Sequence, residues 1–183
     1  MRTKKLTILA MLTAVSLVIF IIESQLPPLA PIPGIKLGLA NIVTLITLAR
    51  IGRREAFLVL ILRIILGCVF TGQMMSLMYS LAGGFLCFAV MAVLIKAAPK
   101  QQRQSRKDGE AAYVIPIWVV SIFGAIAHNA GQVIVAIAIT HLTQIIAFIP
   151  LLIISAVITG AFTGGIATVI ANKKSLWRVL DED

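Results

Sequence analysis

Apolar runs close to the length of a bilayer crossing occupy most of this chain, with only short segments between them. A helix needs about 20 consecutive apolar residues to cross the hydrocarbon core of a membrane. Of the 183 residues, 60% are hydrophobic and 13% are charged, whereas ordinary soluble domains carry roughly 25% charged residues. The chain therefore lacks the polar surface that a soluble protein needs. We predict an all-α membrane protein with six transmembrane helices.

The six predicted helices form a single domain over residues 1–183, with one strongly hydrophilic loop at about 96–112. The first run starts with basic residues like a signal peptide, but it is long for one and no cleavage site follows it. The prolines between residues 27 and 34 exclude a regular helix there. The next run is short for a crossing, so we expect it to pack inside the protein beneath this proline-rich loop. The helices are expected at 6–26, 35–49, 56–70, 74–95, 114–140 and 145–171.

Lysine and arginine are distributed unevenly along the chain. All but two of the 16 lie before residue 6, at 50–54, at 96–107 or after residue 172. Cytoplasmic loops carry such an excess of basic residues, so we expect both termini and the 96–112 loop in the cytoplasm. The net charge of +9 falls in short clusters between apolar runs, a pattern that argues against nucleic-acid binding.

Lys36 and Arg63 are the two exceptions to this distribution. Arg63 lies in the middle of the third run, where a charge is costly and is usually either functional or paired. It can be a structural charge that bonds to carbonyls or to a partner on another helix. It can also anchor an anionic ligand, because a guanidinium group holds carboxylate or phosphate through two hydrogen bonds. The sequence leaves both interpretations open.

Three polar side chains, His128, Asn129 and Gln132, fall within five positions of the fifth run, among small residues at helical spacing. Residues three and four apart share one face of a helix. Close packing of small residues, with hydrogen bonds between helices, explains the glycines of this stripe. A pocket lining explains the three polar side chains better, and we favour that interpretation.

Catalytic and metal-binding patterns are absent from the sequence. No P-loop motif occurs, so the chain is not expected to hydrolyse ATP. The only aspartates are Asp108, Asp181 and Asp183, in the predicted loop and tail, whereas diphosphate chemistry relies on Mg²⁺ held by carboxylates. His128 and His141 are the only histidines, too few to ligate haem from another helix. We therefore predict neither catalytic residues nor a metal site, and no cofactor.

Small residues also mark one face of the first run, near its predicted cytoplasmic end. Ala10 and Ala14 share this face, where a small side chain lets another helix approach closely. The approaching helix can belong to this chain or to another protein.

Two motifs carry a resemblance to a known family. Residues 33–45 read PGIKLGLANIVTL, and residues 127–132 read AHNAGQ. With these motifs, and over nearly its whole length, the chain resembles the Gx transporter family, which is often labelled heptaprenyl diphosphate synthase component I. That family is similar to the substrate-binding S components of energy-coupling factor (ECF) vitamin transporters.

The resemblance implies an S-component-like bundle in a prokaryotic cell membrane, with the loop between the first two helices as an outward lid. It also implies that Ala10 and Ala14 belong to a face that meets the transmembrane coupling subunit, which sits on a pair of ATPases. Some relatives are associated with flavin- and quinone-linked extracellular electron transfer.

We therefore predict the substrate-binding component of an ECF-type transporter for a small vitamin-, flavin- or isoprenoid/quinone-related molecule. The alternatives are an accessory subunit of quinone- or flavin-linked electron transfer and a non-catalytic component of heptaprenyl diphosphate synthase. The predicted partners are the substrate, the lipid bilayer, the coupling subunit and the ATPase subunits. The residues expected to bind the substrate are Lys36, Asn41, Arg63, His128, Asn129 and Gln132.

Overall fold

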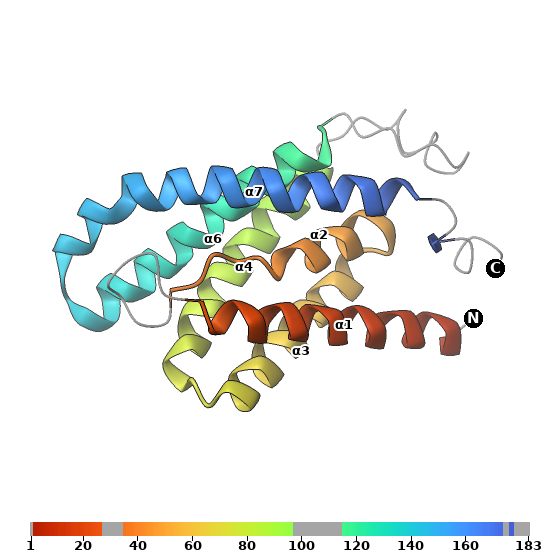
Figure 1. Ribbon diagram of the computed structural model, residues 1–183, viewed down its shortest axis with the longest axis horizontal. Coiled ribbons are helices and arrows are strands. Elements are labelled where there is room, and N and C mark those ends of the chain that lie inside the picture. The colour runs from red at the N-terminus through yellow and green to blue at the C-terminus, as the bar shows by residue number, and fades with distance from the viewer. Residues whose placement is uncertain (1, 27–34, 97–114, 174–175, 178–183) are drawn as a thin grey trace.

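The computed structural model describes residues 2–26, 35–96, 115–173 and 176–177, and these residues form no β-strand. They form six α-helices and one 3₁₀ helix, arranged as a bundle (Figure 1). The helices are α1 (Arg2–Ser24), α2 (Asn41–Arg50), α3 (Arg53–Thr71), α4 (Met74–Lys96), α6 (Ile117–Thr140), η1 (Thr143–Phe148) and α7 (Ile149–Asn172). The all-α prediction is confirmed. The proline-rich segment 27–34 and residues 97–112 of the predicted cytoplasmic loop lie outside the described residues.

Several predicted helix boundaries differ from the observed ones, including the start of the second helix at Asn41 rather than residue 35, and proline explains two of the differences. The last apolar run is not one helix from residue 145, because η1 precedes α7 and Pro150 occupies the first turn of α7. Proline has no N–H to donate, so it fits the first turn of a helix and interrupts a longer one. Similarly, α6 begins at Ile117 with Pro116 as its N-cap, not at residue 114.

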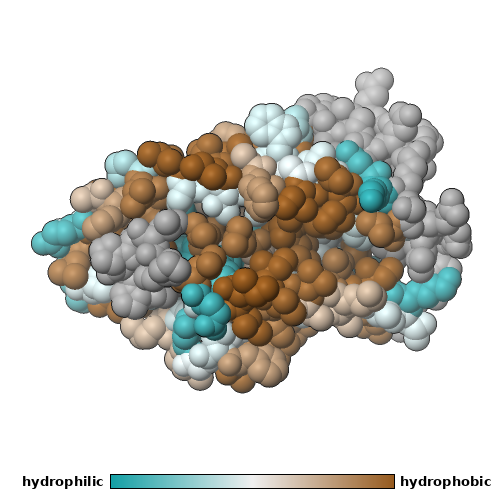
Figure 2. Space-filling model, in the orientation of Figure 1, coloured by the Kyte–Doolittle hydropathy of each residue, from teal (hydrophilic) through white to brown (hydrophobic). Residues whose placement is uncertain are grey.

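Among the described residues, four helical segments are long and apolar enough to cross a membrane: 3–24, 74–96, 117–140 and 143–172. Apolar side chains cover the broad middle of the face drawn in Figure 2. The helix α3 has 19 residues but carries Arg53, Arg54, Glu55 and Arg63. With ten residues, α2 is about 15 Å long, half the thickness of the hydrocarbon core.

The short helix α2 lies inside the bundle, as the length of its apolar run predicted. Every residue from Asn41 to Ala49 is buried. The helix contacts α1, α3, α4, α6 and α7, and its apolar side chains join the largest hydrophobic core. Its first residue is therefore held at a fixed place between the longer helices.

The helices α6 and α7 pack backbone against backbone. A Cβ atom added at Gly164 in α7 would lie 2.5 Å from the Cα atom of Trp118 in α6. Only a glycine allows this approach, so Gly164 belongs to a packing seam between the two helices.

The first turns of α1 and α3 meet at one end of the bundle. Lys5 in α1 pairs with Glu55 in α3 at 2.5 Å, and Arg53 donates a hydrogen bond to the carbonyl of Ala92 in α4 at 3.3 Å. The start of α1 and the end of α7 also lie at this end (Figure 1). The basic residues near these helix termini are therefore gathered on the same side of the bundle.

Candidate ligand-binding site

A cluster of buried polar side chains lies far from the basic end of the bundle, about 27 Å along α1 from Lys5. Its members come from α1, the segment before α2, α2, α3 and α6, and none is more than 8% exposed. The cluster consists of Glu23, Lys36, Asn41, Arg63, His128 and Gln132. Buried polar groups are costly unless they are paired.

Gln132 holds the backbone of Lys36. The side-chain nitrogen of Gln132 donates to the carbonyl of Lys36 at 2.9 Å, and its oxygen accepts the Lys36 N–H at 3.1 Å. The same oxygen lies 3.1 Å from Nε2 of His128, one helical turn away on α6. A glutamine with no exposed surface thus fixes the position of a lysine from an irregular segment.

Among the described residues, no carboxylate forms an ion pair with the ammonium group of Lys36. Its nitrogen lies 3.5 Å from the centre of the Phe20 ring and has no hydrogen-bond partner among the described residues. The ring face attracts a cation, but it satisfies none of the three N–H donors. Lys36 therefore presents a buried cation with unused donors.

Arg63 and Asn41 bond to each other across α3 and α2. Nη2 of Arg63 donates to Oδ1 of Asn41. Nε of Arg63 and Nδ2 of Asn41 have no partner within the described part of the chain. The pair therefore satisfies the amide oxygen and leaves two buried donors unused.

Glu23 reaches the cluster from α1 and accepts the N–H of Gly38. Gly38 has φ +81°, a conformation that favours glycine. A Cβ atom at this position would lie 2.8 Å from side-chain atoms of both Asn41 and His128. Glycine thus lets the segment before α2 approach the carboxylate and the imidazole closely.

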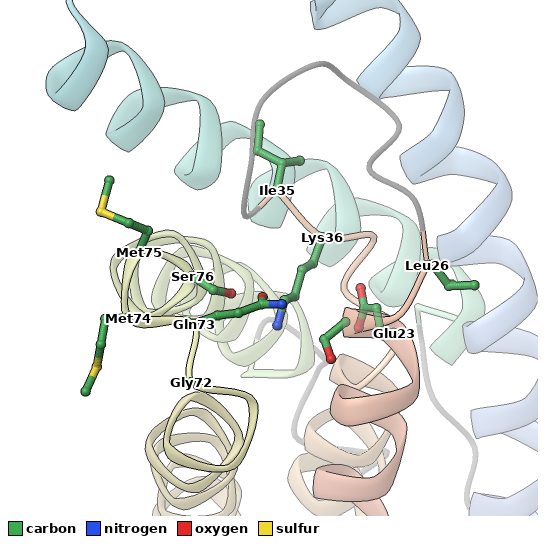
Figure 3. A pocket seen from close by; sticks show the side chains of 10 residues that line it. Glu23, Leu26, Ile35, Lys36, Gly72, Gln73, Met74, Met75 and Ser76 are labelled. Atoms are coloured by element: carbon green, nitrogen blue, oxygen red, sulfur yellow. The ribbon is translucent and has the colours of Figure 1, made fainter.

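Two cavities adjoin the cluster. The smaller one, of about 10 Å³, is lined by Phe20, Glu23, Lys36, Gly38, Arg63, Ile64, Ser80 and His128. The larger one, of about 580 Å³, is lined by Glu23, Ser24, Leu26, Ile35, Lys36, Gly72, Gln73, Met74, Met75 and Ser76 (Figure 3). Glu23 and Lys36 line both cavities. These two charged residues therefore lie at the boundary between the larger cavity and the buried cluster.

Comparison with known proteins assigns the chain to a family. A family model described as heptaprenyl diphosphate synthase component I matches residues 12–170. The chain belongs to this family. The family label predicted from residues 33–45 and 127–132 is therefore confirmed. No curated protein and no solved structure matches the chain. The segment that matches the family model contains every residue of the buried cluster.

Five of the six residues that the sequence predicted for the site lie together in this family member. The exception is Asn129, which faces away from the cluster and donates to the carbonyl of Leu152 in α7 at 2.8 Å. Asn129 lines a separate apolar cavity of about 370 Å³ between α6, η1 and α7. Adjacent residues on a helix point in different directions, so His128 and Asn129 do not share a face.

Sequence reasoning did not include Glu23, Ser76 and Ser80 in the site. Glu23 is the only acidic residue of the first apolar run, and a lone intramembrane carboxylate is itself a signal of function. The two serines carry no such signal, because serine is common in membrane helices. The described residues contain no group of three or more His, Cys, Asp or Glu placed to hold a metal ion.

Proposed function

We propose that this chain is the substrate-binding membrane component of an ECF-type transporter and that it binds a small anionic molecule. The observation that carries the proposal is a pair of buried cations: Lys36, which lines the cavity of about 580 Å³, and Arg63, which lines the small cavity of about 10 Å³ that also borders Lys36. Lys36 has no partner for its ammonium, and Arg63 has none for Nε, among the described residues. Pockets for small molecules are typically 300–1,000 Å³ in volume.

The cost of an unpaired buried charge supports this assignment. Such a charge costs several kcal/mol, and in a protein it persists where a partner or a ligand offsets that cost. An anionic ligand in the larger cavity would accept hydrogen bonds from Lys36. The resemblance to S components fits this chemistry, and vitamin-, flavin- and isoprenoid-related acids all fall within the class.

Transport would depend on other proteins, because the sequence contains no nucleotide-binding motif. Ala10 and Ala14 are exposed on α1. We propose that this face contacts the ECF coupling subunit, which joins the chain to its ATPases. Both termini would then be cytoplasmic, in accord with the excess of basic residues near them.

The orientation can be tested by labelling single cysteines in membrane vesicles of known sidedness. A cysteine at Gln104 should react from the cytoplasmic side, and one at Ala30 from the outer side. Reversed labelling at either position would contradict the proposed topology.

The family description supports a second function, as a non-catalytic component of heptaprenyl diphosphate synthase. The three aspartates are too few and too scattered for a Mg²⁺-diphosphate site, so such a component would assist a separate catalytic chain. An assay of prenyl chain elongation with and without this chain separates the two functions. Elongation that depends on this chain would favour the synthase.

The transporter proposal is tested by extracting the protein with its native lipids and identifying bound small molecules by native mass spectrometry. The wild-type protein, equilibrated with a cell metabolite extract, should retain an anionic molecule. Lys36→Gln should lose it. Lys96→Gln, which removes an exposed lysine from the end of α4, should retain it. Absence of any bound molecule from the wild-type protein would refute the proposal.

A further inference from the structure

The charges around the two cavities are unequal in number. Lys36 and Arg63 supply two positive charges, and Glu23 supplies one negative charge. With His128 neutral, the cluster has one uncompensated positive charge. Neither cation lies within 4.0 Å of a carboxylate oxygen in the described part of the chain.

We propose that the site selects a ligand with a single carboxylate on an apolar body and rejects phosphate and diphosphate esters. This inference rests on the proposed function and names its substrate class. A monoanion brings the buried charge to zero. A diphosphate would leave an excess of negative charge beside Glu23, and like charges repel strongly in a medium of low dielectric constant.

Two unpartnered donors define where the carboxylate binds. The residues Lys36 and Ser76 both line the larger cavity, and their polar atoms, Nζ and Oγ, are buried without a hydrogen-bond partner among the described residues. Figure 3 shows Lys36 entering the cavity from the segment before α2, and Ser76 entering from α4. A carboxylate has two oxygens, so it can accept from the ammonium and from the hydroxyl at the same time.

The rest of the cavity wall suits an apolar ligand body. Four of the lining residues are apolar: Ile35 lies above Lys36 in Figure 3, Leu26 lies to the right, and Met74 and Met75 lie to the left. Methionine side chains adapt to irregular ligands and make favourable contacts with aromatic rings. Glu23 gives the wall one acceptor, which would favour a ligand that also carries an N–H or O–H group.

The test measures the melting temperature (Tm) of the purified full chain with matched probes at equal ionic strength. The probes are 4-phenylbutyrate, its neutral amide, phenyl phosphate and dimethylallyl diphosphate. At ten times its dissociation constant, 4-phenylbutyrate should raise Tm by about 3–6 °C. The amide, phosphate and diphosphate should give less than a third of that shift.

Two variants change the charge in opposite directions. Lys36→Gln should abolish the shift with 4-phenylbutyrate, whereas the exposed control Lys96→Gln should keep it. Glu23→Gln keeps an oxygen that can accept the Gly38 N–H and raises the net charge of the site by one. This variant should therefore reverse the preference, and phenyl phosphate should bind at least tenfold more tightly than it does to the wild-type protein.

The two proposals fail in different ways. Stronger stabilisation of the wild-type protein by dimethylallyl diphosphate than by 4-phenylbutyrate would overturn the carboxylate inference and leave the anion-binding function standing. If no probe shifts Tm and no small molecule is retained from a metabolite extract, both proposals are wrong. An equal response of Lys36→Gln and the wild-type protein to 4-phenylbutyrate would also overturn the inference.

Discussion

Replacing Gln132 with leucine tests whether this residue supports Lys36. Leucine is similar in size to glutamine but forms no hydrogen bonds. The change removes two contacts with the Lys36 backbone, at 2.9 and 3.1 Å, and one with His128 at 3.1 Å. Gln132 has no exposed surface, so we expect water not to replace the lost partners.

The expected loss of stability follows from the two backbone groups alone. Each buried group left without a partner costs about 1–3 kcal/mol. The free energy of unfolding should therefore fall by at least about 2 kcal/mol, which lowers the Tm of a chain of this size by about 4–8 °C. Binding of an anion should weaken as well, because the ammonium of Lys36 would no longer be held in place.

The assay is thermal unfolding of the purified protein with and without a bound anion. Gln144→Leu is the matched control, because Gln144 is exposed in η1. The control should stay within about 1 °C of the wild-type Tm, since exposed substitutions rarely change stability by more than about 0.5 kcal/mol. A Gln132→Leu protein that melts within 1–2 °C of the wild type would refute the role of Gln132 in holding Lys36.

Three further predictions concern the close contacts of the bundle and its outer face. Gly38→Ala should destabilise the protein more than Gly72→Ala. Both glycines have positive φ, but of the two only Gly38 would place a Cβ atom within 3 Å of other side chains. Equal Tm values of the two variants would contradict this prediction. Gly164→Ala should lower stability by about 1–3 kcal/mol in the same measurement, whereas Gly165→Ala, whose Cβ meets open space, should be neutral. Ala14→Trp should reduce co-purification with ECF subunits at least tenfold and leave Tm unchanged, and undiminished pull-down would count against docking there.

Much of the fold could be predicted from the sequence because a bilayer demands long apolar helices with few alternatives. The expected burial of α2 also followed from length, since the apolar run at 35–49 is short for a crossing. The wrong boundaries at Pro116 and Pro150 came from giving hydropathy more weight than the local effect of proline. Both prolines were visible in the sequence.

The candidate site was less predictable, because its contacts join segments far apart in the chain. Intramembrane charge and polarity pointed to Arg63 and His128 individually. They could not indicate that Gln132 would bind the backbone of Lys36, since the conformation of an irregular segment depends on the helices around it. The orientation of Asn129 could have been predicted from helical periodicity, because adjacent residues such as His128 and Asn129 point in different directions around a helix.

The polar atoms of the cluster divide into those that hold the structure and those that are left without a partner. The side chain of Gln132 is fully used on the Lys36 backbone and His128, and Oδ1 of Asn41 is used by Arg63. The unpartnered atoms include Nζ of Lys36, Nε of Arg63 and Nδ2 of Asn41, and all three can only donate hydrogen bonds. A water molecule in this space could accept two such bonds but would leave the positive charge uncompensated. An anion can accept hydrogen bonds from these donors and also neutralise the positive charge. The cluster therefore favours an anionic ligand over a neutral one.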